Sequence, residues 1–296
     1  MAEMVEVTTE ELSYLSRNGT PIGARLYRPR GPGPFPAMVD AHGGAWIQGS
    51  FVNNDPINRR IAAGGILVLA IDYSLPPAGT YPSSVADMNY AIRWLKLHAE
   101  RYGVRPEWVG AMGTSSGGHL AVLAAIKPND KRYAETPLGG GGAVDAQVSC
   151  VVTMWPVICP LTRFRENLER KTSGDQNYAT RVGAGLDQMK YWLSEEAMAN
   201  GSPMLAVERG DDVAMPDVLY VQATGDTLHP RHCMDRFCAA YRKRGGRVEA
   251  VLVEGSPYDF IRTDPECAEA KRAMRRMIEF VHECKAGADH VVGSRE

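Results

Sequence analysis

The sequence predicts an α/β protein whose mostly parallel central sheet is covered by helices on both faces. Short apolar runs bounded by glycine and proline alternate with amphipathic helical patterns along most of the chain. Several of these runs are continuously apolar, as in strands that are buried on both faces. The chain has 296 residues, of which 44% are hydrophobic, and this is enough for one large core. We therefore expect a single domain over residues 1–296.

The expected elements alternate along the chain. Residues 22–27 alternate apolar and polar side chains, as an outer strand does. The other expected strands are 36–41, 66–71, 108–113, 148–154, 218–224 and 248–253. The expected helices are 54–63, 84–101, 116–126, 232–244 and 266–283. Asn54 or Asp55 is expected to cap the first helix and Gly64 to end it.

Residues 155–216 interrupt this alternation. They contain several short helical patterns and no clear strand pattern. Such an insertion between two core strands predicts a helical cap over one end of the sheet. Ligands bind at the carboxyl ends of parallel strands, so the cap is expected to cover the site. The N-terminal segment is a second candidate contributor to this cap.

Charge and composition exclude some classes of partner. The chain carries 33 basic and 35 acidic residues, a net charge of −2, so we expect neither nucleic acid nor membrane as a partner. No stretch reaches the roughly 18 apolar residues of a membrane-spanning helix, and residues 1–11 lack the apolar core of a signal peptide. The six cysteines show no metal-ligand spacing. We expect a cytoplasmic protein with free thiols and no metal or organic cofactor.

A candidate nucleophile lies between the strand 108–113 and the helix 116–126. Gly113-Thr114-Ser115-Ser116-Gly117 matches the pattern G-x-S-x-G in the strand-to-helix context that this pattern requires. A serine at such a sharp turn projects its Oγ out of the sheet, and the following helix presents unpaired N–H groups that favour negative charge. Ser115 is therefore the expected nucleophile.

A candidate oxyanion loop follows the strand 36–41. His42-Gly43-Gly44-Ala45-Trp46 places two glycines where main-chain N–H groups can point into a cavity. Acyl transfer needs such donors around the developing oxyanion. We expect Gly44, Ala45 and Ser116 to supply them, with Gly43 as a lesser candidate. His42 is expected to brace the loop.

These motifs resemble the hormone-sensitive-lipase-like branch of the α/β-hydrolases, a family of carboxylesterases and lipases. His42–Trp46 resembles the family's HGGG-type loop, and Asp72–Pro77 its D-Y-R-L-A-P stretch. The string GTSSGG at 113–118 stands where the family usually has GDSAGG, and Trp155–Val157 resembles its Y-P-V segment. The resemblance extends from Leu26 to the final helix, with a divergent cap. It implies an α/β-hydrolase fold and a Ser-His-Asp site.

The same resemblance assigns the acid and reveals a departure at the base. Asp226 follows the strand 218–224, where the family has its triad aspartate. The family's histidine lies in the loop after the last strand, where this chain has Tyr258 in Gly-Ser-Pro-Tyr-Asp-Phe. A phenol with a pKa near 10 is ionised in about one part in a thousand at pH 7, so Tyr258 is a poor replacement for imidazole as a base.

Two other histidines are candidates for the base. His229 lies three residues after Asp226, near the expected rim of the site. His119 lies one turn along the helix from Ser115 and is expected to pack into the fold. If neither replaces the missing histidine, oxyanion stabilisation and binding alone would leave about 10³–10⁴-fold catalysis over water.

The leading hypothesis for function is a serine carboxylic-ester hydrolase for small or short-chain acyl esters. It would form an acyl-enzyme on Ser115 and be impaired if Tyr258 stands in for the base. Two alternatives remain: a receptor-like protein that binds a ligand without hydrolysis, and a lyase or dehydratase that uses Tyr258 as an acid. The expected edge strand 248–253 could pair with a second copy in a homodimer.

Overall fold

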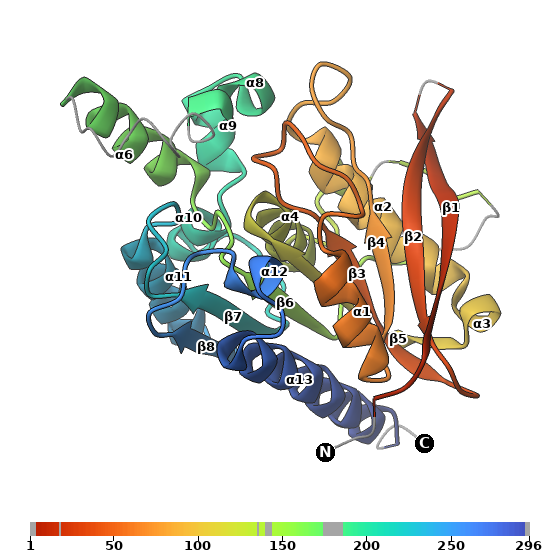
Figure 1. Cartoon of the computed structure of the whole chain (residues 1–296). Coiled ribbons are helices and arrows are strands. Elements are labelled where there is room, and N and C mark those ends of the chain that lie inside the picture. The colour runs from red at the N-terminus through yellow and green to blue at the C-terminus, as the bar shows by residue number, and fades with distance from the viewer. Residues whose placement is uncertain (1–3, 18, 135, 140–143, 174–185, 294–296) are drawn as a thin grey trace.

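In the computed structural model, residues 4–17, 19–134, 136–139, 144–173 and 186–293 are described, and an eight-stranded sheet runs through them (Figure 1). The strand order is β1-β2-β4-β3-β5-β6-β7-β8. The strands are β1 Val7–Arg17, β2 Thr20–Pro29, β3 Phe35–Ala41, β4 Leu67–Ile71, β5 Val104–Thr114, β6 Cys150–Met154, β7 Asp217–Ala223 and β8 Val248–Val253. Pairing is antiparallel from β1 to β4 and parallel from β4 to β8.

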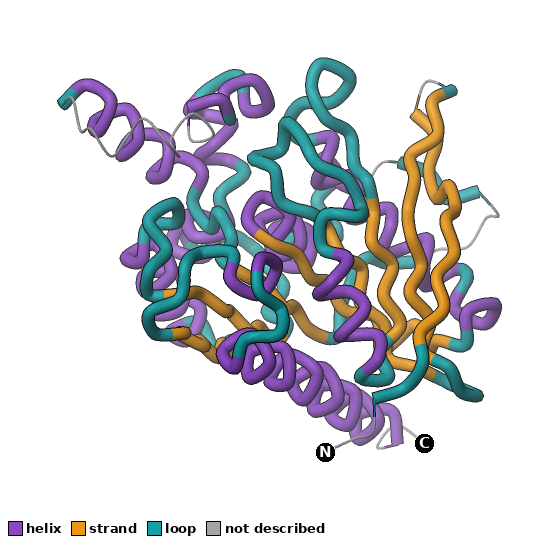
Figure 2. The backbone as a smooth tube through the Cα atoms, viewed as in Figure 1, coloured by secondary structure: helices purple, strands orange, loops and turns teal. Residues whose placement is uncertain are grey.

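Two layers of helix cover the sheet (Figures 1 and 2). One face packs against α1 Asp55–Ala63, α12 Phe260–Thr263 and α13 Ala268–Gly293. The opposite face packs against α2 Ser83–Leu97, α4 Ser115–Ile126 and α11 Arg231–Lys243. Two short helices, α3 Ala99–Tyr102 and α5 Lys131–Ala134, lie near α2. Strands β3, β4, β6 and β7, and β5 from Trp108 onward, are almost wholly buried, which explains their apolar runs.

The predicted strands and the main helices are confirmed, most with ends shifted by a few residues, whereas the helix expected over 266–283 continues to Gly293 as α13. Among the described strands, β1 is not predicted by the sequence pattern, and its residues lie in the N-terminal segment that is a candidate part of the cap. It pairs with β2 at the edge of the sheet. Much of its surface is exposed, and it carries Glu10 and Glu11, so its pattern lacks the apolar run of a buried strand. The helix expected over 84–101 divides at His98 into α2 and α3.

The insertion between β6 and β7 is helical. Its described elements are α6 Pro160–Thr172, α8 Met189–Trp192, α9 Glu195–Asn200 and α10 Pro203–Arg209. In Figure 1, α6, α8 and α9 rise above the end of the sheet where β5 meets α4. Residues 174–185 of the expected cap lie outside the described residues. No helix in the described part of the chain is both long and apolar enough to cross a bilayer.

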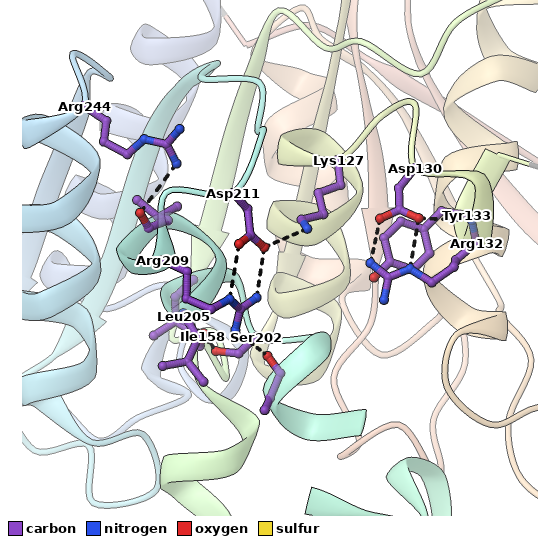
Figure 3. Close-up of polar contacts among 12 residues, drawn as sticks. Lys127, Asp130, Arg132, Tyr133, Ile158, Ser202, Leu205, Arg209, Asp211 and Arg244 are labelled. Atoms are coloured by element: carbon purple, nitrogen blue, oxygen red, sulfur yellow. Dashed lines mark hydrogen bonds and ion pairs between the residues drawn. The ribbon is translucent and has the colours of Figure 1, made fainter. Parts of the chain in front are cut away.

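Polar contacts fasten this insertion to α4. Arg209 and Lys127 both pair with the Asp211 carboxylate, at 2.9 and 3.0 Å (Figure 3). Beside α9, the buried His119 ring accepts a hydrogen bond from Trp46 Nε1 at 3.2 Å and donates from Nε2 to the Gly201 carbonyl at 2.7 Å. Trp46 Nε1 can only donate, which fixes the tautomer of His119. His119 therefore connects the oxyanion loop, α4 and the insertion.

We expect His119 to make the protein sensitive to mild acid. Burial lowers the pKa of His119 to about 4, whereas in the unfolded chain it titrates near 6.5. Between these values the unfolded state binds more protons, so the free energy of unfolding falls as the pH drops from about 6.5 to 4, by ~3 kcal/mol for this group. His119→Gln should lower the free energy of unfolding at pH 7. It should also reduce the number of protons taken up on unfolding between about pH 4 and 6.5 by up to one, so the free energy of unfolding should depend less on pH. Urea unfolding at several pH values would measure both effects. An unchanged slope would contradict the prediction.

Candidate active site

The turn from β5 into α4 holds Ser115 in a strained conformation. Its φ is 51°, a left-handed value that non-glycine residues rarely adopt. A Cβ on Gly117 would overlap the main chain at Ala41 and His42, and one on Gly113 would overlap Gly117. Only glycine therefore allows β3, β5 and α4 to approach this closely. Close main-chain packing therefore explains both glycines of the G-x-S-x-G pattern.

The side chain of Ser115 meets His229. Ser115 Oγ lies 3.1 Å from His229 Nε2, and His229 Nδ1 lies 2.8 Å from Asp226 Oδ2. The carboxylate makes Nδ1 the protonated nitrogen, which leaves Nε2 to accept the serine proton. The side chain of His229 is 3% exposed and that of Asp226 is fully buried. The Ser115 hydroxyl, the His229 imidazole and the Asp226 carboxylate thus form a hydrogen-bonded series with the connectivity of a Ser-His-Asp triad.

Asp226 and His229 belong to one tight turn after β7. Asp226 Oδ1 accepts main-chain N–H bonds from Leu228 at 2.9 Å and His229 at 3.1 Å, and Oδ2 faces the imidazole. Gln222 Nε2 donates to the His229 carbonyl at 2.8 Å and closes the turn from the strand side. Local hydrogen bonds therefore set the distance between carboxylate and imidazole.

Tyr258, at the sequence position of the family's histidine, does not occupy the place next to Ser115. The ring in hydrogen-bond contact with Ser115 Oγ is that of His229. The Tyr258 ring packs beside it, 6.0 Å from the His229 ring and 6.4 Å from Trp155, edge to face with the latter. We therefore correct the expectation that Tyr258 stands at the position of the base. The expectation that His119 packs into the fold agrees with its buried contacts to Trp46 and Gly201.

The loop after β3 lies against the elbow. A Cβ on Gly43 would lie 3.4 Å from Ser115 Cβ, so this residue is adjacent to the nucleophile. Gly44 has a φ of 130°, and a Cβ there would overlap the Gln48 main chain. Ala45 and Trp46 also have positive φ, 54° and 62°. Among the hydrogen bonds of the described residues, none uses the N–H groups of Gly44 or Ala45.

The His42 side chain packs against this loop and against Tyr73. Its ring stacks on Tyr73 at 4.3 Å, and its Nδ1 lies 2.7 Å from the Gly43 carbonyl. Tyr73 in turn donates to the His42 carbonyl at 2.9 Å. Burial lowers the pKa of His42 to about 4, so the ring is neutral near pH 7. These contacts fit a bracing role.

A buried polar network under the elbow was not expected from the sequence. Thr114 Oγ1 donates to Asn54 Oδ1, and the Asn54 amide donates to the Asp40 carboxylate, both at 3.1 Å. Asn58 Nδ2 also donates to Asp40, at 2.8 Å. Burial raises the pKa of Asp40 to about 6. Asn54 stands at the start of α1, as predicted, but its side chain makes no capping bond and reaches this network instead. The sequence signal for this network was Asp40, a charged residue within the otherwise apolar run of β3.

A family model described as an α/β-hydrolase fold matches residues 38–262 of this sequence. The chain belongs to the α/β-hydrolase fold family. The match includes the oxyanion loop, the elbow and the turn with Asp226 and His229, and it extends across the insertion. Family membership therefore covers every element of the candidate site.

Several curated proteins are similar in sequence to this chain. An ethyl acetate hydrolase from Pseudomonas putida is 27% identical over 290 residues, which is 92% of this chain and 82% of that protein. Esterase LipC of Mycobacterium tuberculosis is 36% identical over 117 residues, which is 39% of this chain. The chain covers only 29% of LipC and 36% of LipM, a probable carboxylic ester hydrolase of the same organism.

Solved structures support the same architecture. An esterase from the hyperthermophilic archaeon Pyrobaculum calidifontis aligns with a TM-score of 0.75 at 24% identity, over 93% of this chain and 85% of that one. Esterase 2 of Thermogutta terrifontis aligns with a TM-score of 0.70 at 23% identity, over 94% of both chains. Because both sequence identities are below 25%, these similarities show only a shared fold.

Proposed function

We propose that this α/β-hydrolase is a serine carboxylic-ester hydrolase that acts on small or short-chain acyl esters. The observation that carries the proposal is the series Ser115–His229–Asp226, with hydrogen-bond distances of 3.1 and 2.8 Å. The similarity to proteins named as esterases and carboxylic ester hydrolases supports the same reaction class.

In the proposed reaction, His229 Nε2 accepts the Ser115 hydroxyl proton as Oγ attacks the ester carbonyl carbon. The N–H groups of Gly44, Ala45 and Ser116 stabilise the tetrahedral oxyanion, with Gly43 lining the same loop. His229 then gives the proton to the leaving alcohol, and an acyl-enzyme remains on Ser115. Water, deprotonated by the same imidazole, releases the acid. Asp226 holds the imidazole in the required tautomer and stabilises the imidazolium.

The geometry favours hydrolysis over the two alternatives. A receptor for a neutral ligand needs neither a base aligned on a strained serine nor unpaired N–H groups beside it. A lyase that uses Tyr258 as its acid would not need the hydrogen bonds that orient His229 toward Ser115. The role proposed for Tyr258 is to pack against His229 and Trp155.

The direct test is covalent labelling by a fluorophosphonate ester. The native chain should take up one phosphonyl group, located by peptide mass spectrometry on Ser115, and should lose hydrolysis of p-nitrophenyl acetate and butyrate in the same proportion. Ser115→Ala should take up none. A native chain that stays unlabelled and does not hydrolyse these esters would overturn the proposal and favour a binding protein.

A further inference from the structure

A buried arginine lies beside the candidate triad and has no role in the proposed reaction. Arg163, in the first turn of α6, is 3% exposed. It lines a small hollow together with His229 and residues 156–159, 230 and 233. The hollow opens to solvent and has room for about one water molecule, so only the end of a ligand, such as a carboxylate oxygen, fits into it.

The guanidinium of Arg163 is incompletely satisfied. Its Nε and Nη1 atoms are buried and have no hydrogen-bond partner. Among the ion pairs of the described residues, none involves Arg163. The Asp226 carboxylate acts on Arg163 electrostatically, but its oxygens already accept bonds from His229, Leu228 and Gln222. A buried cation without an anion is costly, and its usual partner is a carboxylate or phosphate.

An apolar side chain at position 163 would avoid the cost of burying this cation. The hollow is otherwise formed by proline, valine, isoleucine and cysteine side chains, with His229 at one side. His229, which lines the hollow, has its Nε2 3.1 Å from Ser115 Oγ, so the hollow lies next to the candidate triad. An anion held by Arg163 would thus belong to a molecule that also reaches Ser115.

We propose that Arg163 binds a carboxylate carried by the substrate, so that the preferred esters are negatively charged. The inference rests on the proposed ester hydrolysis and specifies its substrate class. The carboxylate belongs either to the acyl part, as in monoesters of dicarboxylic acids, or to the alcohol part, as in acylated hydroxy acids. A charge-assisted hydrogen bond to the guanidinium would then select for the anionic ester.

Matched pairs of esters test the proposal. For the acyl part, p-nitrophenyl hydrogen adipate is compared with its methyl ester, and for the alcohol part, para-carboxyphenyl acetate with its methyl ester. In the native chain, kcat/KM should be higher for the anionic member of at least one pair, which also identifies the part that carries the charge. Arg163→Gln should lower that anionic-to-neutral ratio by about 10–100-fold, and Arg163→Lys should keep part of it.

Arg165→Gln is the matched control, because Arg165 lies on the same helix with its side chain 60% exposed and paired with Glu195. This variant should leave the ratio unchanged. The inference is overturned if the native chain gives an anionic-to-neutral ratio at or below one for both pairs. It is also overturned if Arg163→Gln leaves the ratio unchanged. In either case, hydrolysis of the neutral esters would still support the proposed function. If no ester is hydrolysed, the proposed function fails by itself. Calorimetry with adipate then decides: binding lost in Arg163→Gln supports the anion site, and binding that is absent or unaffected overturns it.

Discussion

Replacing His229 by alanine is expected to lower kcat for p-nitrophenyl butyrate by about 10⁶-fold, close to the loss seen when a triad base is removed from other serine hydrolases. The physical reason is that Ser115 Oγ has its hydrogen bond to this imidazole, at 3.1 Å. Without an acceptor, the neutral hydroxyl is a weak nucleophile. Steady-state kinetics, with circular dichroism to verify folding, would measure the effect.

Tyr258 provides the contrast to that experiment. Tyr258→Phe keeps the ring that packs against His229 and Trp155 and removes only the hydroxyl. It should therefore change kcat by less than about 10-fold, well below the loss of a general base. Tyr258→His would restore the residue that the resembled family has there, and it should not raise kcat while His229 is present. A large loss in Tyr258→Phe with little loss in His229→Ala would reverse the assignment.

Asp226→Asn is expected to lower kcat by about 10⁴-fold, the magnitude known for this change in a serine protease triad. The two main-chain donors at Leu228 and His229 would hold the asparagine oxygen at the Oδ1 position. The amide nitrogen would then face His229 Nδ1 and donate to it. This forces the proton onto Nε2, which can no longer accept the Ser115 proton.

The control for Asp226→Asn is Asp235→Asn on α11, where the carboxylate is 56% exposed and pairs with Arg231. The same chemical change there should leave kcat unaltered. Phosphonate labelling of Asp226→Asn should be slowed to a similar degree as ester hydrolysis, because both begin with attack by Ser115. Unchanged hydrolysis in Asp226→Asn would remove the carboxylate from the mechanism.

The sheet, the elbow and the loop after β3 could be predicted from the sequence because each has a strong local cause. Gly117 is required by the close approach of β3, and the buried strands appear as apolar runs. From the sequence, His229 was one of two candidate bases near the expected site, and its contact with Ser115 could not be predicted because it depends on how the turn after Asp226 folds back toward Ser115. The edge strand β1 was missed because exposed strands lack that run, and the Asp40–Asn54–Thr114 network because its residues meet only in the folded chain.

The placement of Asp226 and His229 in one turn has a consequence for the segment between β8 and α12. That segment holds neither His229 nor Asp226, because both follow β7. Residues 254–259 still contact that turn, because Ser256 accepts a hydrogen bond from the Gly225 N–H at 3.2 Å and the Tyr258 ring lies 6.0 Å from the His229 ring. Substitutions there therefore change the packing around His229, while the contacts among Ser115, His229 and Asp226 are made by residues outside the segment.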